Sequence, residues 1–347
     1  MVSIYDLVTA ENIAGYYSAA QEGVDLTIGE RFFPARKQLG LALKHIKAAG
    51  GKNVALKPSA FNVEATLRDR ISVDLDSKKM PFFKEAMNID EEDRQELNIM
   101  LSTNNQQYID AVATNIYDDQ ATLVRAAKTQ LEIMRMQVLA TGKVLIDDNG
   151  VDKEFDYGVS DNNKGEAEIA WSEASADPLD DIDNAILKLK QRGVVPGAIV
   201  MNSNTFAQIK NNENTSKAIN GTSGKRVTNR RLKEFLQDEY GLVVVEQSGV
   251  YENSKGETHP LYPDGHVTLA PNTGQGIGRT VFGTTPEESD LMNAGSLANV
   301  RIVEEGIAVT TSKEVDPVNV LTKVSMIALP SFEGANQVYQ LHTAPTA

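Results

Sequence analysis

One stretch of the sequence decides the fold: residues 82–141 read FFKEAMNIDEEDRQELNIMLSTNNQQYIDAVATNIYDDQATLVRAAKTQLEIMRMQVLAT, with neither glycine nor proline. Glycine and proline are the strongest local breakers, so this window is predicted to be helical. In its second half, apolar residues recur at steps of mostly three and four, on one stripe of a single helix. These are Ile109, Val112, Ile116, Leu123, Ala127, Leu131, Met134 and Val138.

The second half is therefore predicted to be one helix, from an N-cap at Asn104 to a left-handed cap at Gly142. Charged residues, among them Lys128, Glu132 and Arg135, fall largely outside its apolar stripe. At about 1.5 Å per residue, residues 105–141 would form a rod roughly 55 Å long. Helices of globular domains usually run about 8–20 residues, so the length indicates an extended subunit that contacts its neighbours.

The sequence before this helix is predicted to form an arm at 1–46 and an extended loop at 47–85. A short helix is expected around residues 10–20. Phe32 and Phe33 then lie in an aromatic patch, which either packs locally or anchors the arm in a neighbouring subunit. Between 52 and 81, polar and apolar residues alternate as in a charged two-stranded hairpin without a local core. A lone two-stranded ribbon is marginal in water, so we expect it to lie on another subunit.

After the rod, the turn at Asn149-Gly150 predicts a β-hairpin that joins 143–146 to 153–159. A short helix is also expected at 90–100, before the rod. From residue 173, helices and strands alternate, which predicts an inserted α/β layer over 173–299. Its expected elements are helices from Asp177-Pro178 to Gly193, from Ser203, and over 228–240, strands at 198–201, 242–246 and 267–269, and polar loops at 211–225 and 253–265.

Strands expected at 301–303, 308–310, 320–329 and 337–341 would return to pair near the long helix. The chain would then be an α+β protein with a discontinuous base domain, 86–172 and 300–347, that carries the insertion.

Composition fits a soluble globular protein, with 347 residues of which 41% are hydrophobic and 24% charged. No apolar run is long enough to span a membrane, and the first residues do not resemble a signal peptide, so we expect a cytoplasmic protein. There is no cysteine and there are only four histidines. Few residues are therefore available as metal ligands or for histidine-based catalysis. The net charge of −14 argues against a protein that grips nucleic-acid phosphates, although an acidic wall can still enclose nucleic acid.

No motif predicts catalysis, a cofactor or a metal ion. Gly274-Gln275-Gly276-Ile277-Gly278 has its third glycine one residue early for a dinucleotide loop, and a strand is expected to follow. Gly221–Arg226 lacks the residues of a phosphate loop at two positions. A calcium loop with Gly150 at its sixth position would start at Leu145, which cannot bind the ion, so the acidic run 147–150 is read as a hairpin turn. The basic residues Lys225, Arg226, Arg230 and Arg231 form the densest cationic cluster, read as a solvated face or partner contact before a nucleic-acid contact.

The order of elements resembles the tailed-phage major capsid fold, the Hong Kong 97 fold: an arm, an extended loop, a spine helix, an inserted α/β domain and returning strands. Several stretches are also similar to the phage lambda type of major head protein. They are residues 130–143 (QLEIMRMQVLATGK), Trp171 with Asp177-Pro178 and Asp181-Ile182, 261–265 (LYPDG) and 326–330 (MIALP). The resemblance covers roughly 90–341, and the first 50 residues fit by position only.

This resemblance implies a structural protein, not an enzyme, that assembles into pentamers and hexamers of an icosahedral head around double-stranded DNA. The implied partners are copies of the chain, a separate scaffolding protein (since no fused scaffold precedes the arm), a portal protein and in some cases a decoration protein. DNA would be packaged without sequence-specific contact, and no membrane is involved. The protein would be a virion component assembled in the bacterial cytoplasm, with 86–172 and 300–347 as the peripheral domain and 173–299 as the axial domain.

The candidate residues for contacts between subunits are Phe32, Phe33, Arg68, Arg70, Lys78, Lys79, Arg230 and Arg231. Some relatives also weld subunits through a lysine–asparagine bond, for which Lys78 or Lys79 would be the lysine, with no partner identified. Two alternatives stay open. One is an encapsulin-like bacterial compartment of the same fold, and the other is a small hydrolase domain that uses carboxylates such as Asp180 and Asp183 in a pocket.

Overall fold

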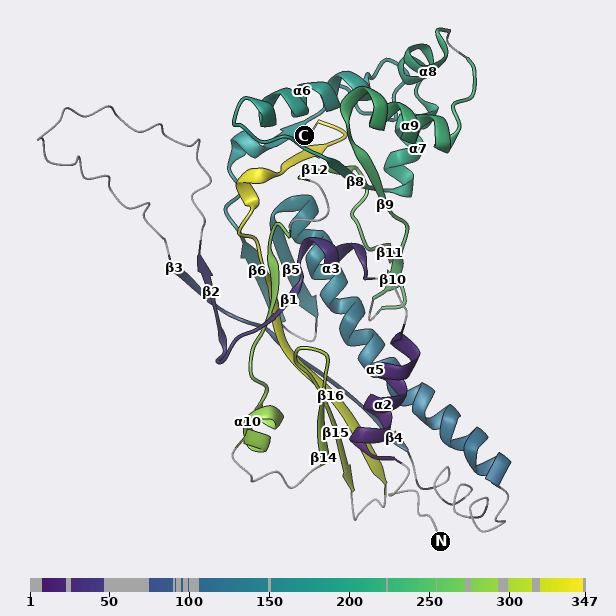
Figure 1. The fold of residues 1–347 in the computed structure, drawn as a ribbon, viewed down its shortest axis with the longest axis vertical. Helices are drawn as coiled ribbons and strands as arrows, with labels where there is room; N and C mark the ends of the chain where they lie inside the picture. Colours follow the sequence, from purple (N-terminus) through teal and green to yellow (C-terminus); the bar gives the residue numbers. More distant parts are fainter. Residues whose placement is uncertain are drawn as a thin grey trace, which may run out of the picture.

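The helix α5 (Gln106–Thr141) is 36 residues long and runs diagonally between the two ends of the molecule (Figure 1). The computed structural model describes residues 8–22, 26–46, 75–89, 106–148, 151–222, 224–253, 255–271, 276–292, 299–313 and 319–345, and positions 91, 95 and 99. The predicted rod is confirmed. Gly142 ends it with a φ of 73° and an N–H donated to the Val138 carbonyl over 2.9 Å, while the expected N-cap at Asn104 lies outside the described residues.

The first part of the breaker-free window is a strand, so the helical prediction is wrong there. Strand β4 (Phe82–Ile89) pairs antiparallel with strand β16 (Val320–Ser331), from Phe82 opposite Ile327 to Ile89 opposite Val320. Alternate residues Phe83, Met87 and Ile89 pack on the core, as the period of a strand requires. Absence of glycine and proline permits a strand as well as a helix, and pairing with a long neighbour decides between them. The helix expected at 90–100 lies largely outside the described residues.

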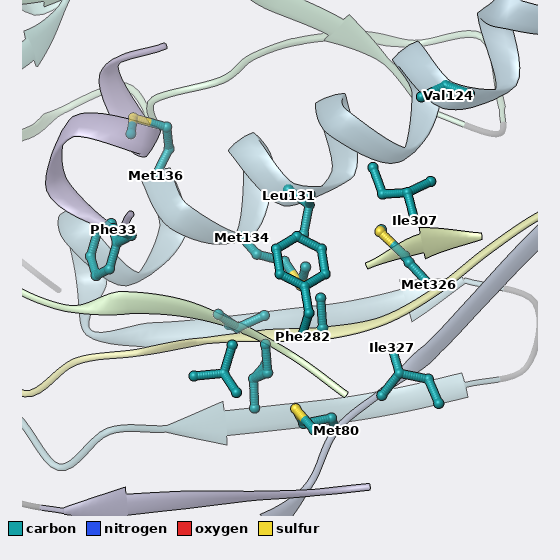
Figure 2. Close-up of a cluster of buried hydrophobic side chains, with 14 of the residues drawn as sticks. Phe33, Met80, Val124, Leu131, Met134, Met136, Phe282, Ile307, Met326 and Ile327 are labelled. Carbon is teal, nitrogen blue, oxygen red and sulfur yellow. The ribbon is translucent and has the colours of Figure 1, made fainter. Parts of the chain in front are cut away.

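A six-stranded sheet packs one face against α5. Its long strand β16 pairs with β4, with β15 (Ile307–Lys313) and, at its end, with β13 (Arg279–Phe282). The remaining strands are β14 (Asn299–Val303) on β15 and β1 (Ala35–Lys37) on β13. Figure 2 shows Leu131 and Met134 of α5 directed at Phe282 and Met326 of this sheet. All four of these side chains are fully or almost fully buried.

A five-stranded sheet lies near the C-terminal end of α5, in the order β7-β17-β12-β8-β9. Its strands are β7 (Lys164–Glu166), β17 (Tyr339–His342), β12 (His266–Ala270), β8 (Ala198–Asn202) and β9 (Val243–Gln247). The helices beside it are α6 (Pro178–Lys190), α7 (Ser203–Asn211), α8 (Glu213–Asn220) and α9 (Asn229–Tyr240). The predicted helices and strands of the α/β layer are therefore confirmed, except at α8.

Strand alternation connects this sheet to both neighbouring layers. Tyr339 and Leu341 belong to the core shared with the helices, whereas Gln340 between them donates its amide to the carbonyls of Val138 and Leu139 at the end of α5. Thr268 donates its hydroxyl to the same Leu139 carbonyl over 2.8 Å. One face of the sheet thus holds the helical layer and the other holds the end of the spine.

Residues 211–225 were expected to be a polar loop, but they contain helix α8. Asn212 caps it by accepting the backbone N–H groups of Asn214 and Thr215, and Gly221 ends it in the left-handed conformation. Asn212 also donates its amide to the Ala176 carbonyl over 3.0 Å. The helix is built almost entirely from polar residues, so apolar periodicity does not reveal it.

The predicted domain boundaries assign two strands, β13 and β17, to the wrong sheet. Strand β13, within 173–299, pairs with β16 in the sheet of the spine, and β17, within 300–347, pairs with β12 and β7 in the other sheet. The chain therefore crosses between the two sheets more often than one insertion requires. The end of β17 still lies against the long helix, through Gln340.

Three antiparallel strand pairs extend from this body among the described residues. The predicted hairpin after the rod is confirmed as β5 (Lys143–Asp148) and β6 (Val151–Asp156). Strands β10 (Val250–Glu252) and β11 (Thr258–Pro260) form the second within an expected loop. The third, β2 (Ala42–Ile46) with β3 (Leu75–Lys79), stands at the side of the molecule. The rest of the ribbon predicted at 52–81, up to residue 74, lies outside the described residues.

Candidate functional site

The N-terminal segment packs on the spine helix of its own chain. Helix α2 (Ala10–Gln21), predicted around 10–20, and the short helix α3 (Ile28–Phe32) both lie along α5 (Figure 1). Thr27 begins α3 with a capping box, in which its hydroxyl accepts from the Glu30 N–H and Glu30 accepts from the Thr27 N–H. The arm is therefore an ordered part of this subunit over its described residues.

A buried carboxylate holds the arm to the spine. Glu132 of α5 accepts the Thr27 hydroxyl over 2.8 Å and the Gly29 backbone N–H over 2.8 Å. A Cβ atom at Gly29 would lie 2.3 Å from Glu132 Oε2, so this approach requires a glycine. Gln247 at the end of β9 donates to the same carboxylate over 3.4 Å, which brings the second sheet to the junction.

Two cations on the same stripe of α5 balance the acids around them. Arg135 is only 2% exposed, donates to Thr280 of β13 over 2.8 Å and lies 3.4 Å from Glu132. Lys128, with its ammonium group 2.9 Å from Glu304 and 3.6 Å from Glu30, closes the other end. We call these five residues, Glu30, Lys128, Glu132, Arg135 and Glu304, the arm clamp.

The pKa shifts at the clamp follow from burial and from these pairs. Burial lowers the pKa of Arg135, against the opposing attraction of Glu132 and Glu30, and the guanidinium stays charged. Burial opposes ionisation of Glu30, but the Thr27 N–H and the two cations outweigh it and lower the pKa. Burial and the neighbouring Glu304 carboxylate raise the pKa of Tyr17 to about 12. The Thr27 N–H and the two cations of the clamp therefore favour the ionised form of Glu30.

Glu304 has a φ of 52° and is the non-glycine residue with a left-handed backbone among the described residues. It lies between β14 and β15, and its carboxylate accepts from the Tyr17 hydroxyl of α2 over 3.3 Å as well as pairing with Lys128. A side chain in this conformation costs free energy, which indicates that the contacts of the carboxylate hold the turn in place.

The arm clamp is not predictable from the sequence, because its partners are far apart in the chain. One signal was available: Lys128, Glu132 and Arg135 are spaced four and three residues apart, so they share a stripe of the helix distinct from its apolar stripe. A charged stripe of this kind beside the apolar stripe of a helix predicts a polar partner, but not which segment supplies it.

The predicted contact residues are in different environments. Phe32 and Phe33 are both fully buried in the core of their own subunit, and Figure 2 shows Phe33 in that core. Their prediction as anchors in a neighbour is therefore wrong, and the local packing alternative holds, because no ring surface is left for a partner. Arg68 and Arg70 lie outside the described residues. Lys78 pairs through its backbone with Leu43, and Lys79 is exposed.

Arg230 and Arg231, the other predicted contact residues, are exposed at the start of α9. Arg230 pairs with Glu234 over 2.7 Å, and its side chain remains 86% exposed. Arg231 donates to the Asn220 side chain at the end of α8 over 2.8 Å. Both guanidinium groups are therefore on a surface that a partner can reach.

The hydrolase alternative required carboxylates in a pocket, and the structure contradicts it. Asp180 and Asp183 are both exposed on the outer face of α6, where Asp180 accepts the Asn184 amide over 3.1 Å. Asp181 is half-buried, and it accepts the Trp171 indole N–H over 2.8 Å. Burial is the main cause that raises the pKa of the Asp181 carboxyl group. The hydrogen bond from the Trp171 indole gives this carboxyl group a structural role. Acids on the first turns of a helix are favoured for local reasons alone.

The described residues add little support for other chemistry. Residues 279–282 after the glycine-rich stretch form strand β13, as predicted, where a dinucleotide fold needs a helix. In the part of the chain that the structure describes, no three histidine, aspartate or glutamate residues group as metal ligands. Among the same residues, no helix is long and apolar enough to cross a membrane.

A spine helix on one sheet, with a second sheet and its helices at the end of the spine, defines the Hong Kong 97-like capsid fold of tailed phages. The solved structures that share this fold include the following two. One is a candidate capsid protein of an E. coli CFT073 prophage, at a TM-score of 0.60 and 13% identity over 96% of this chain and 99% of that chain. The other is a phage-related protein of Bordetella bronchiseptica RB50, at a TM-score of 0.59 and 13% identity over 98% of this chain and 99% of that chain.

The chain belongs to the family described as phage major capsid protein E, whose model matches residues 12–342. No curated protein sequence matches it. The resemblance inferred from the sequence is thus confirmed, and the protein is a phage major capsid protein and a structural component of the virion. Membership of this family favours the phage capsid over the bacterial compartment.

Proposed function

We propose that the protein self-assembles into pentamers and hexamers that close an icosahedral shell around double-stranded DNA. The observation that supports this most is the family match over residues 12–342, on a fold whose spine helix joins two sheets into one elongated subunit. A closed shell needs modest head-to-tail contacts that repeat around rings, and an extended subunit offers contacts at both ends.

Each of the two sheets, with the helices packed on it, would form one domain of the capsid subunit. The spine helix with its sheet and the β5–β6 hairpin would form the peripheral domain, and the sheet with α6 to α9 the axial domain that meets its copies around the ring axis. The strands β2 and β3 at the side of the body would carry the extended loop onto a neighbour. Lys79 is exposed beside this loop, as a contact with a neighbour requires.

The proposed partners follow from shell assembly. A scaffolding protein would select curvature, since one chain must form rings of both five and six, and a portal protein would occupy one vertex. A decoration protein is a further partner for the finished surface. Packaged DNA would meet a wall without sequence-specific contacts, in keeping with the net charge of −14. Assembly would take place in the cytoplasm of the bacterial host.

Co-expression with the scaffolding protein, followed by negative-stain microscopy, tests the proposal. We expect closed shells of uniform diameter. Small discrete particles under all conditions of salt, concentration and scaffold would contradict it. Nucleic-acid content of shells made with and without the portal and packaging proteins would test the DNA cargo separately.

A further inference from the structure

The helical layer of the axial sheet carries its charge in two blocks. Residues 165–187, which lead into α6 and form most of it, contain seven acidic residues and no lysine or arginine. Residues 210–233, from the end of α7 to the middle of α9, contain seven lysines and arginines and one glutamate. In a chain with a net charge of −14, a block with a net charge of +6 is a strong local departure.

The basic block forms a projecting surface, the basic tip, which we define by Lys217, Lys225, Arg226, Arg230 and Arg231. Side chains of α8 hold its loop in place: Ser216 donates to the Lys225 carbonyl over 2.7 Å, and Asn220 donates to the same oxygen over 3.3 Å. All five cationic residues are exposed. Figure 1 shows this loop at the outer corner of the helical layer, beyond α8 and the start of α9.

The acidic block forms a second surface, the acidic face, which we define by Glu168, Glu173, Asp177, Asp180 and Asp183. All five are exposed. Among the described residues, the ion pairs of the basic tip are limited to Arg230 with Glu234, and none joins the tip to the acidic face. Apart from Arg230, the residues that define the basic tip and the acidic face make no ion pair with other described residues, and the two surfaces lie in the same layer at the same end of the molecule.

From this complementarity we infer that the basic tip of one subunit docks on the acidic face of the next copy around the capsomer ring. A contact between two different patches of identical chains is head-to-tail, and it closes into a ring when the rotation fits. Complementary potentials orient such contacts and exclude wrong pairings. The inference rests on the proposed shell function and names the surfaces that make its axial contacts.

Packaged DNA is the other polyanion that could meet the basic tip. The acidic face favours a second copy, because it lies in the same helical layer and would repel DNA drawn toward that layer. A second copy supplies a matching acid block for every basic tip, and it removes the like-charge repulsion that the acids impose on one another.

Charge reversal with rescue tests the docking. The variants are K225E/R226E on the tip, D180K/D183K on the acidic face, and the four changes together. None of these four side chains caps a helix or makes an ion pair among the described contacts. K153E/K255E, on two exposed lysines in hairpins away from both surfaces, is the matched control for charge. Each is co-expressed with the scaffolding protein, and closed shells are counted by microscopy and sedimentation.

We expect each reversed pair to lower the yield of shells by about tenfold or more, and the fourfold variant to recover most of the yield. The control should assemble like the wild type. Raising the salt to 1 M should weaken assembly of the wild type, because screening then acts over about 3 Å. Circular dichroism and thermal unfolding of the free subunits establish that each variant folds. Should a reversed pair unfold the subunit, K225Q/R226Q and D180N/D183N replace it, with a smaller expected loss.

The outcomes separate the inference from the proposed function. If K225E/R226E and D180K/D183K both assemble normally, the docking inference is wrong. If the normally assembled shells of K225E/R226E also hold less DNA, the basic tip contacts nucleic acid instead. Absence of rescue in the fourfold variant, or an equal loss in the control, also overturns the docking inference. In both cases the wild type still forms shells, so the proposed function stands; a wild type that never assembles contradicts that function itself.

Discussion

Gly29 donates its backbone N–H to Glu132 Oε1 over 2.8 Å, across 103 positions of the sequence. This bond fixes the arm on the spine helix at a point where both segments of the chain are buried. A hydrogen bond to a buried carboxylate is among the stronger ones in proteins, and leaving the carboxylate short of donors is costly. The arm clamp should therefore contribute to the stability of the subunit before any shell forms.

Substitution of Gly29 by alanine should destabilise the isolated subunit by about 1–3 kcal/mol, because the new Cβ would lie 2.3 Å from Glu132 Oε2. Denaturant unfolding measures the change. Gly15 in α2 is the control, since a Cβ there meets no atom within 4 Å. G15A should raise the free energy of unfolding by about 0.4–1 kcal/mol. Equal effects of the two variants would show that the close approach does not matter.

The left-handed backbone of Glu304 can be separated from its side-chain contacts. E304A and E304G both remove the carboxylate that binds Tyr17 and Lys128. Alanine keeps the steric cost of a φ of 52°, whereas glycine does not. We expect E304G to be more stable than E304A by about 1 kcal/mol in denaturant unfolding. The opposite order, which is usual where φ is negative, would mean that the turn is unstrained.

The spine helix and β17 are joined by Gln340, whose amide donates to the Val138 and Leu139 carbonyls over 3.1 and 2.9 Å. Q340L removes this donor from both carbonyls, which keep the Gly142 N–H and the Thr268 hydroxyl, and should cost about 0.5–1.5 kcal/mol in the free energy of unfolding. Gln337 is exposed nearby, and Q337L should change stability by less than about 0.5 kcal/mol. Equal free energies of unfolding for Q340L and Q337L would contradict a stabilising role of the Gln340 side chain.

Stability should fall in mild acid because of His266. Its ring lies 4.9 Å from that of His342 in the opposite strand, and burial, with a smaller contribution from His342, lowers the pKa of His266 below 6.5. The unfolded chain then binds more protons than the folded one, so stability is lost as the pH falls below about 6.5. Unfolding at pH 7.5 and 5.5 should show a smaller loss for H266Q than for the wild type.

H259Q, in the β10–β11 hairpin, is the matched substitution for that experiment. A wild-type stability that is flat between pH 7.5 and 5.5, or a loss that H259Q abolishes and H266Q does not, would contradict the assignment.

Local patterns predicted those elements whose determinants lie within a few residues. The apolar stripe of α5 with its glycine cap, the Asn149-Gly150 signal between two alternating runs, and the Asp177-Pro178 start of α6 are local patterns of this kind. The structure confirms α5, the paired strands β5 and β6 on either side of residues 149–150, and α6. The capsid fold was predicted from the resemblance of the whole order of elements, from the arm to the returning strands, and of several short motifs to a known family.

Pairings between distant segments were not predictable in the same way. Strand β4 becomes a strand by pairing with residues 320–327, and β13 and β17 join sheets that their position in the sequence does not indicate. The arm clamp depends on Glu30, Glu132 and Glu304 meeting two cations of one helix, which no single window contains. The sequence leaves open whether Phe32 and Phe33 pack locally or anchor the arm in a neighbour, and tertiary packing buries both.

Cryo-electron microscopy of particles purified after co-expression with the scaffolding protein tests the central claim most directly. We predict a closed icosahedral shell in which each subunit keeps the spine helix and both sheets, with rings of five and six copies around the axial domains. A homogeneous population of monomers or small oligomers in every preparation, with no closed shells, would contradict the account.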